Sequence, residues 1–202
     1  MVAIIDYGLG NIASVQKALN ALNLENIITS NSKRIKESSS VILPGVGSFT
    51  QGIKNLRERN LDEILYEEVM VKKKPFLGIC LGMQLIFEKG NEPNPCKGLG
   101  WIPGEVRKIN SKKNIKLPHL GWNAIRKKDD KEYQDQLANN YYFIHSYHVL
   151  PENINDIHSY VNYGEEIVAS VKKENIFATQ FHPEKSQVAG LEMLKSFFDG
   201  NA

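Results

Sequence analysis

One cysteine, Cys80, stands where a catalytic nucleophile could be held. It follows the short apolar run Phe76–Ile79, which predicts a buried strand, and it precedes apolar residues at helical spacing. Glycines at positions 78 and 82 flank it, and this Gly-x-Cys-x-Gly pattern is typical of the sharp strand-to-helix turn called a nucleophile elbow. A thiol in such a turn faces unpaired N–H groups at the start of the helix, which favour the reactive thiolate. The alternative is a structural cysteine, because free cysteine is among the most buried residue types.

A second segment, near the end of the chain, offers the base that a thiol nucleophile needs. The run 176–181 predicts a strand that ends at His182, and Glu184 follows two residues later. His182 can accept the thiol proton and return it to a leaving amine, while Glu184 orients the imidazole and stabilises its charged form. His145 and His148 are alternative bases, but no carboxylate follows either at short spacing, so we interpret them as structural. We therefore predict a cysteine–histidine–glutamate triad.

The elements that must position this triad follow a strand–helix alternation. Helical patterns fill the spaces between apolar runs, including a crossover at 49–73 and a segment from 81 to 89. Such alternation predicts a parallel sheet covered by helices, with the active site at the carboxyl ends of the strands. The predicted strands of this half span residues 2–7, 26–29, 41–43 and 76–79.

The second half of the chain has a different pattern. Strongly β runs at 141–149, 157–163 and 167–171 predict further strands, and an amphipathic helix closes the chain. We find no internal repeat and no low-complexity linker, so we predict a single domain over residues 1–202. The predicted fold is α/β, a mostly parallel open sheet covered by helices with added antiparallel strands.

The glycine-rich segment 44–47, after the third predicted strand, could supply an oxyanion hole. Backbone N–H groups at such a strand end can point at a developing oxyanion, and each such donor contributes about 2.7–4 kcal/mol. A nucleophile elbow supplies a second donor from the residue after the nucleophile, here Leu81. We predict that the N–H groups of Gly47 and Leu81 form this hole; the alternative for 44–47 is a plain turn.

The turn after the first predicted strand admits a different function. The Gly-x-Gly-x-x-Ala sequence at 8–13 fits the dinucleotide-binding fingerprint, which also requires an acidic residue at the end of the second strand. That strand ends at Ser30 and Asn31, and the acid is missing. We therefore interpret the glycines as a turn, with Asn11 as the cap of the following helix.

Composition excludes several classes of function. The chain has 202 residues with 25 basic and 23 acidic side chains, and this balance predicts no nucleic-acid or membrane-surface binding. The two cysteines form no disulfide framework, and Cys96 is interpreted as incidental. No apolar run approaches the ~20 residues of a membrane span, and the first strand leaves no room for a signal peptide, so we expect a cytoplasmic protein. Histidines and cysteines lack metal-ligand spacing, and neither a metal nor another cofactor is predicted.

Together these motifs resemble the triad-type (class I) glutamine amidotransferases, which hydrolyse glutamine to glutamate and ammonia. More narrowly, the chain resembles the family of glutaminase subunits of imidazole glycerol phosphate synthase, from histidine biosynthesis. The stretches that carry the resemblance run through almost the whole chain: Asp6-Tyr7-Gly8-x-Gly10-Asn11, Pro44-Gly45-Val46-Gly47, Gly78-Ile-Cys80-Leu-Gly82-Met-Gln84, Pro118-His119-Leu-Gly121-Trp122-Asn123, His145-Ser146-Tyr147 and Phe181-His182-Pro-Glu184-Lys185-Ser186.

The resemblance implies a flavodoxin-like core and roles for further residues. Gln84 lies one helical turn past the nucleophile and would hold the amino-acid part of glutamine, with Ser146 and Tyr147; a helix-surface glutamine is the alternative. The peptide near Val46 would turn its N–H inward only when a partner subunit holds its own substrate. The surface meeting that partner would comprise Asn11, Pro118, Trp122, Asn123, Tyr142 and Lys185.

The predicted chemistry is acyl transfer through a γ-glutamyl thioester, and the released ammonia needs an acceptor. The glutaminase motifs leave no room for an acceptor-binding domain, so we expect a second polypeptide. The resemblance implies a (βα)8-barrel cyclase that forms a heterodimer, receives ammonia through an internal tunnel, and makes imidazole glycerol phosphate and AICAR. Alternatives are a paralogous glutaminase serving a sugar-modifying enzyme of surface-glycan synthesis, a thiol hydrolase of other γ-glutamyl compounds, and a non-catalytic scaffold subunit, against which the intact triad argues.

Overall fold

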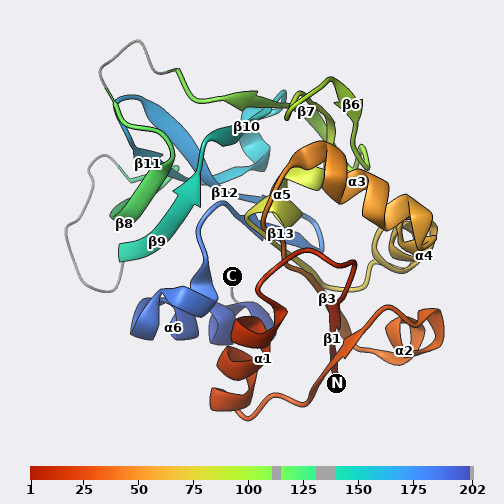
Figure 1. The fold of residues 1–202 in the computed structure, drawn as a ribbon. Helices are drawn as coiled ribbons and strands as arrows, with labels where there is room; N and C mark the ends of the chain where they lie inside the picture. Colours follow the sequence, from red (N-terminus) through yellow and green to blue (C-terminus); the bar gives the residue numbers. More distant parts are fainter. Residues whose placement is uncertain (111–114, 131–139, 201–202) are drawn as a thin grey trace.

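A computed structural model describes residues 1–110, 115–130 and 140–200, and Figure 1 shows a central sheet with helices on both sides. The first half contains β1 (Val2–Ile5), α1 (Ile12–Ala21), β2 (Asn26–Thr29), α2 (Ser32–Glu37), β3 (Ser40–Leu43), α3 (Phe49–Glu58), α4 (Leu61–Leu65), a π-helical segment (Tyr66–Val71), β4 (Phe76–Ile79), α5 (Leu81–Leu85) and β5 (Phe87–Gly90). The second half contains β6 (Cys96–Lys97), β7 (Ile102–Lys108), β8 (His119–Lys127), β9 (Asn140–His145), β10 (Tyr147–Pro151), a 3-10 turn (Ile154–Asp156), β11 (Ile157–Asn162), β12 (Glu166–Lys173), β13 (Ile176–Thr179), a 3-10 turn (Pro183–Lys185) and α6 (Gln187–Phe198).

The large sheet has a parallel half and an antiparallel half. Its strand order is β2-β1-β3-β4-β13-β12-β11-β8-β9, and the first five strands pair in parallel. The next four pairings, from β13–β12 to β8–β9, are antiparallel. The order 2-1-3-4 at the parallel end is that of flavodoxin-like sheets. The predicted α/β fold is therefore confirmed, including the added antiparallel strands.

Both faces of the parallel half are covered by helices, which explains why β1 and β4 contain no polar residue and are fully buried. Successive residues of a strand point to opposite faces. Ile4 packs with Leu19 of α1 and Leu194 of α6, whereas its neighbour Ile5 lies in the cluster that contains Leu56 of α3. In Figure 1, α1 and α6 accordingly lie on the opposite side of the sheet from α3 and α4.

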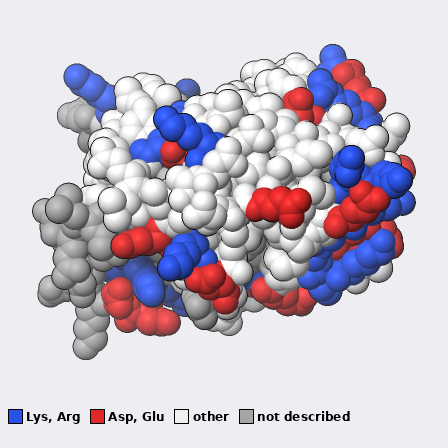
Figure 2. Space-filling model, turned by 90° about the horizontal axis from the view of Figure 1, so that it is seen from below, with Lys and Arg blue, Asp and Glu red and all other residues white. Residues whose placement is uncertain are grey.

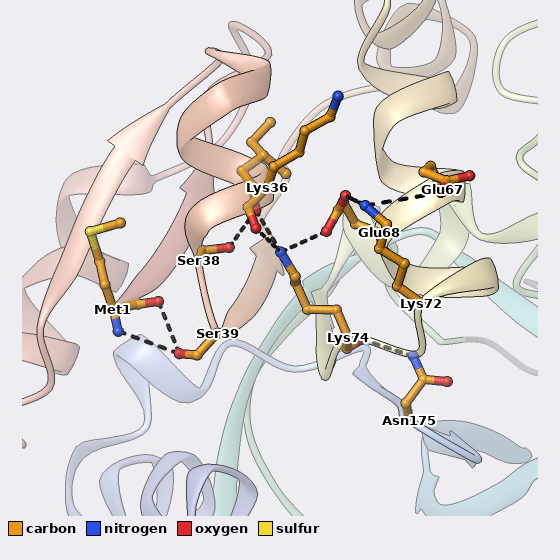
Figure 3. A network of polar contacts seen from close by, with 10 residues as sticks. Met1, Lys36, Ser38, Ser39, Glu67, Glu68, Lys72, Lys74 and Asn175 are labelled. Carbon is orange, nitrogen blue, oxygen red and sulfur yellow. Dashed lines mark hydrogen bonds and ion pairs between the residues drawn. The ribbon is translucent and has the colours of Figure 1, made fainter.

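A buried ion pair fixes the crossover helix at the end of the sheet where β4 begins (Figure 3). Glu68, in the π-helical segment, is 1% exposed and accepts hydrogen bonds from Lys72 at 2.7 Å and pairs with Lys74 at 2.8 Å. The Lys74 ammonium also donates to the Ile35 carbonyl at 2.7 Å, and Asn175 donates to the Lys74 carbonyl at 2.8 Å. This network lies at the amino end of β4, opposite the end at which Cys80 follows the strand.

Two stretches differ from the prediction. The helix after Cys80 ends at Leu85 rather than extending to 89, because Phe87–Gly90 instead forms a strand that pairs with β7 and β6. The run 141–149 is not one strand. It breaks at Ser146, so that β9 joins the large sheet whereas β10 pairs with β7 in a second sheet of order β10-β7-β5-β6.

The surface of the described residues matches the balanced composition. On the face shown in Figure 2, lysine and arginine side chains are interspersed with aspartate and glutamate rather than gathered in a patch of one sign. Among the helices that the structure describes, none is long and apolar enough to cross a membrane.

Candidate active site

Cys80 occupies a tight turn between β4 and α5. Its backbone has φ 54° and ψ −106°, a left-handed conformation that is unfavourable for a residue with a side chain. The flanking glycines allow this turn to pack closely: a Cβ on Gly82 would collide with the Leu43 carbonyl of β3, and one on Gly78 would lie 3.0 Å from the Gly82 carbonyl. The elbow therefore depends on the absence of side chains at both positions.

His182 and Glu184 form a buried pair. The imidazole Nδ1 and Glu184 Oε1 are 2.7 Å apart, and both side chains are 2% exposed. Burial by itself lowers the pKa of His182, but the charge on Cys80 and the Glu184 carboxylate outweigh burial and raise it to about 10. The other nitrogen, Nε2, has no partner within strict hydrogen-bond geometry among the described residues, but a weaker contact with the Cys80 side chain contributes to the raised pKa. It is therefore the nitrogen available to exchange a proton with Cys80.

The pairing of β13 with β4 brings this histidine to the cysteine. The two strands are parallel neighbours in the register Thr179↔Ile79, so their carboxyl ends lie together. Cys80 donates its backbone N–H to the Thr179 carbonyl at 2.7 Å, which joins the elbow to the end of β13. The three residues of the predicted triad thus meet at one edge of the sheet.

A cavity of about 420 Å³ opens beside Cys80. Its lining includes most of the residues predicted to act on substrate, namely Gly47, Cys80, Leu81, Gln84, Ser146 and Tyr147. The cavity is thus built by the elbow, the glycine-rich segment after β3 and the bend between β9 and β10. A volume of this size suits a small ligand such as an amino acid.

The two residues predicted to supply the oxyanion donors both line this cavity. Leu81 is the first residue of α5, and the first N–H groups of a helix have no acceptor within the helix. Gly47 has φ 107°, which requires glycine. Both residues line the cavity together with Cys80, so their N–H groups remain our candidates for the oxyanion hole.

Gln84 lies in the cavity wall but is already hydrogen-bonded. It is buried rather than on a helix surface, and its Nε2 donates to the Tyr147 carbonyl at 3.0 Å and to Gln180 Oε1 at 3.1 Å. Gln180 in turn places its Nε2 3.7 Å from the Cys80 sulfur. Gln180 was not among the predicted site residues, although a glutamine within the apolar run 176–181 is an unusual feature that could have indicated it.

Two buried histidines support the substrate side of the cavity. A carbonyl can only accept, so His145 donates from Nδ1 to the Tyr147 carbonyl at 2.9 Å and its Nε2 must accept from His119 Nδ1 at 3.0 Å. His119 Nε2 then accepts from Asn123 Nδ2 at 2.8 Å. Burial lowers the pKa of His119 to about 4. Burial and, to a smaller extent, the charge of His119 lower the pKa of His145 to about 3, so both imidazoles stay neutral. This chain of donors fixes the bend at Ser146.

Glu92 is a second residue of the cavity that was not predicted from the sequence. It follows β5 in a loop, is half-buried and lines the cavity. Burial raises the pKa of its carboxyl group, although a backbone hydrogen bond from Phe49 and the charge of Lys108 oppose the shift. Its sequence context, a loop with prolines at 93 and 95, carries no signal of a site. Only the folding of this loop over the cavity reveals it.

The structure places two of the six predicted partner residues in the lining of the cavity. Pro118 and Lys185 line it, and the Lys185 ammonium lies over the Tyr142 ring, 5.7 Å from its centre. Trp122, 47% exposed, is paired with Tyr142 across β8 and β9. Asn11 caps α1, and this helix packs against the turn that carries Lys185. The side-chain amide of Asn123 points inward and is hydrogen-bonded to His119.

Four exposed apolar side chains gather in the same region, and we call them the mouth surface: Val46, Leu120, Trp122 and Ile144. Val46 and Ile144 line the cavity, and Leu120 is paired with Ile144 on the same sheet edge as Trp122.

No group of three or more histidine, cysteine or acidic side chains in residues 1–110, 115–130 and 140–200 is arranged to hold a metal ion. Cys80 and Cys96 are both free thiols.

Comparison with known proteins assigns the chain to a family. The family described as "Glutamine amidotransferase class-I" matches residues 3–200. The chain is a class I glutamine amidotransferase. The amidotransferase is 47% identical over 199 residues to "Imidazole glycerol phosphate synthase subunit HisH 1" of Campylobacter jejuni. This match covers 98% of each of the two chains. The amidotransferase is 46% identical over 200 residues to the subunit HisH of Bacillus cereus, covering 98% of this chain and 93% of that one.

Solved structures agree with the fold of the amidotransferase. A structure described as PurLQS from Thermotoga maritima superimposes with a TM-score of 0.75 at 16% identity, covering 100% of this chain and 98% of that one. At this identity the likeness concerns the fold alone. The predicted resemblance, fold and glutaminase activity are thus confirmed, and the comparisons match the more specific resemblance to glutaminase subunits of imidazole glycerol phosphate synthase.

Proposed function

We propose that this amidotransferase is the glutaminase subunit of imidazole glycerol phosphate synthase. The observation that carries the proposal is the buried Cys80–His182–Glu184 arrangement beside a cavity of amino-acid size, in a chain that resembles such subunits along nearly its whole length. The activity would supply ammonia for histidine biosynthesis.

The proposed reaction has two acyl-transfer steps. The Cys80 thiolate attacks the side-chain carbonyl of glutamine, and the N–H groups of Gly47 and Leu81 stabilise the oxyanion that forms. His182 gives its proton to the leaving nitrogen, and ammonia departs as the thioester forms. His182, held by Glu184, then takes a proton from water, which attacks the thioester. The Cys80 thiolate is expelled, glutamate leaves and its new carboxyl group loses its own proton to solvent. His182 keeps the proton that it took from water, so the starting thiolate–imidazolium pair is restored.

Glu92 provides a basis for recognising the amino-acid part of the substrate. Glutamine carries an α-ammonium group, and a half-buried carboxylate in the cavity wall is its natural partner. We expect Glu92→Gln to raise KM for glutamine about tenfold or more. The substrate analogue 4-carbamoylbutanoate, which lacks the amino group, should be affected much less. Glu152→Gln, at an exposed position, is the matched control. Equal effects on both substrates would contradict this role.

The partner that we propose is a (βα)8-barrel cyclase docked on the mouth surface. An exposed apolar group around a catalytic opening fits a partner that both covers the cavity and receives ammonia from it. Trp122→Ala should weaken binding of the cyclase by about 30-fold, as expected for a central aromatic contact. Tyr66→Ala, an exposed aromatic on the crossover helix, is the control. Equal loss in both variants would argue against this docking face.

The proposed function is tested by glutamate release from glutamine. The purified chain is assayed alone, with the co-expressed cyclase subunit, and with the cyclase plus its ribonucleotide substrate; Cys80→Ala is the control. We expect release to rise sharply with the liganded cyclase and to vanish in the variant. A rate of glutamate release that does not change when this cyclase is added would indicate another acceptor enzyme. No glutamate release in the presence of a bound cyclase would contradict the glutaminase role.

A further inference from the structure

The Tyr7 phenol, which has no hydrogen-bond partner among the described residues, lies beside segment 44–47. Tyr7 follows β1 and is fully buried. Its hydroxyl makes no hydrogen bond to any residue that the structure describes. Buried polar groups are nearly always paired, because an unpaired one loses its bonds to water without replacement. We therefore expect this hydroxyl to form a hydrogen bond in another conformation of the enzyme.

The hydroxyl lies beside Gly45 and the start of α5. A Cβ built on Gly45 would collide with the Tyr7 hydroxyl and would lie 2.8 Å from Leu81 Cβ and 3.2 Å from the Gly82 nitrogen. The phenol thus fills the space that a side chain at Gly45 would need, next to the first turn of α5. Burial and then the charge on Cys80 raise the pKa of Tyr7, so the hydroxyl keeps its proton as a donor.

The loop that carries Tyr7 is held in place. Asn55 of α3 donates to the Tyr7 carbonyl at 2.9 Å, and Arg59 donates to the Asp6 carbonyl at 3.2 Å. Gly10, at φ 123°, packs against Gly45 so closely that a Cβ there would lie 3.4 Å from its Cα. Because the phenol is enclosed and its backbone is anchored, its partner has to come from the backbone beside it, which is the glycine-rich segment 44–47 and the start of α5.

The geometry of a peptide group identifies that partner. In a planar trans peptide the N–H and the C=O point in opposite directions. If an N–H of segment 44–47 points into the cavity toward the oxyanion, the carbonyl of the same peptide points away from the cavity, toward the interior. A carbonyl buried there needs a donor, and the Tyr7 hydroxyl is an unused donor next to Gly45.

We propose that Tyr7 is a positioning residue of the glutaminase reaction. Its hydroxyl donates to a backbone carbonyl of segment 44–47 and so holds the conformation in which this segment presents an N–H to the oxyanion. The inference rests on the proposed glutaminase chemistry. It also explains why position 45 lacks a side chain: the phenol and the peptide must approach each other directly.

The test is Tyr7→Phe, which removes the hydroxyl and keeps the ring. Since the hydroxyl makes no hydrogen bond to the described residues, the variant should have an unchanged or higher Tm. Its kcat for glutamate release, measured with the liganded cyclase, should fall about tenfold, with KM unchanged within twofold. Alkylation of Cys80 by iodoacetamide, a reaction without an oxyanion, should change less than twofold. Tyr141→Phe, another buried tyrosine, is the matched control and should leave kcat within twofold.

Several results would overturn the inference. An unchanged kcat in Tyr7→Phe, with or without a lower Tm, would make the hydroxyl catalytically irrelevant. A fall in kcat accompanied by an equal fall in alkylation would assign the effect to the thiol rather than to segment 44–47. Failure of the proposed function is recognised separately, because the wild-type protein would then release no glutamate in the same assay.

Discussion

Lowering the pH from about 7.5 to 5 should destabilise this amidotransferase through His119 and His145. The two imidazoles are buried against each other and are held neutral between the Asn123 amide and the Tyr147 carbonyl. Their pKa values fall from the ordinary 6.5 to about 4 and about 3. Between pH 6.5 and these values, the unfolded chain binds protons that the folded chain does not. Stability is therefore complete above pH 6.5 and is lost as the pH falls below it.

The magnitude follows from the distance between the pH and the ordinary pKa. At pH 5 each unfolded histidine lies about 1.5 pH units below its pKa and is almost fully protonated, whereas both folded histidines are still neutral. One unit corresponds to about 1.4 kcal/mol, so each histidine removes about 2 kcal/mol and the pair about 4 kcal/mol. Typical folding free energies are about 5–15 kcal/mol, so this loss would be a large fraction of the total.

The assay is denaturant unfolding at both pH values, for the wild type and for the double variant His119→Gln/His145→Gln. Glutamine can hydrogen bond but does not titrate in this range. The wild type should lose about 4 kcal/mol more than the variant on going to pH 5. The single variant His119→Gln should recover about half of the difference. Equal losses in wild type and double variant, within about 1 kcal/mol, would refute the assignment of acid sensitivity to this pair.

Three further substitutions test the elements that hold the site. Glu184→Gln keeps the length of the side chain but removes the negative charge that lies beside the His182 imidazole. The kcat for glutamate release should fall on the order of 10⁴-fold. A fall of less than tenfold would contradict the orienting role of Glu184. Lys74→Met leaves Glu68 buried with Lys72 as its remaining cation. Denaturant unfolding should show that the free energy of unfolding falls by about 3 kcal/mol. A fall of less than about 1 kcal/mol would mean that Lys72 alone is enough to neutralise Glu68. Gly82→Ala would drive a Cβ into the Leu43 carbonyl, so thermal unfolding should reveal a loss of about 1–3 kcal/mol, and a wild-type Tm would show that the elbow can yield.

Elements set by near neighbours in the chain were predictable. The strand Phe76–Ile79 and the elbow after it follow from an apolar run and two glycines within seven residues. The cap of α1 by Asn11 follows from one side chain and the N–H groups three residues away. Such features depend on local sterics and hydrogen bonds, so the sequence contains nearly all the information that they need.

Features set by strand pairing were not predictable. The run 141–149 has one continuous β pattern, yet it breaks at Ser146 because its halves pair with different strands, β8 and β7. Periodicity describes which face a residue takes, but it does not say which strand lies next to it. The bend at Ser146, which brings Tyr147 to the cavity, was therefore beyond the sequence pattern.

The types of the catalytic groups, and the strand ends on which they stand, could be read from the chain: a cysteine in an elbow, and a histidine with a carboxylate two residues later. The packing of the folded chain is needed to know that β13 lies beside β4 and that Glu92 and Gln180 join the site. It is also needed to know that the Tyr7 hydroxyl, without a hydrogen-bond partner among the described residues, lies beside Gly45. A cavity is lined by residues far apart in the chain. Their approach is fixed by the packing of whole strands and helices, and no short stretch of sequence specifies it.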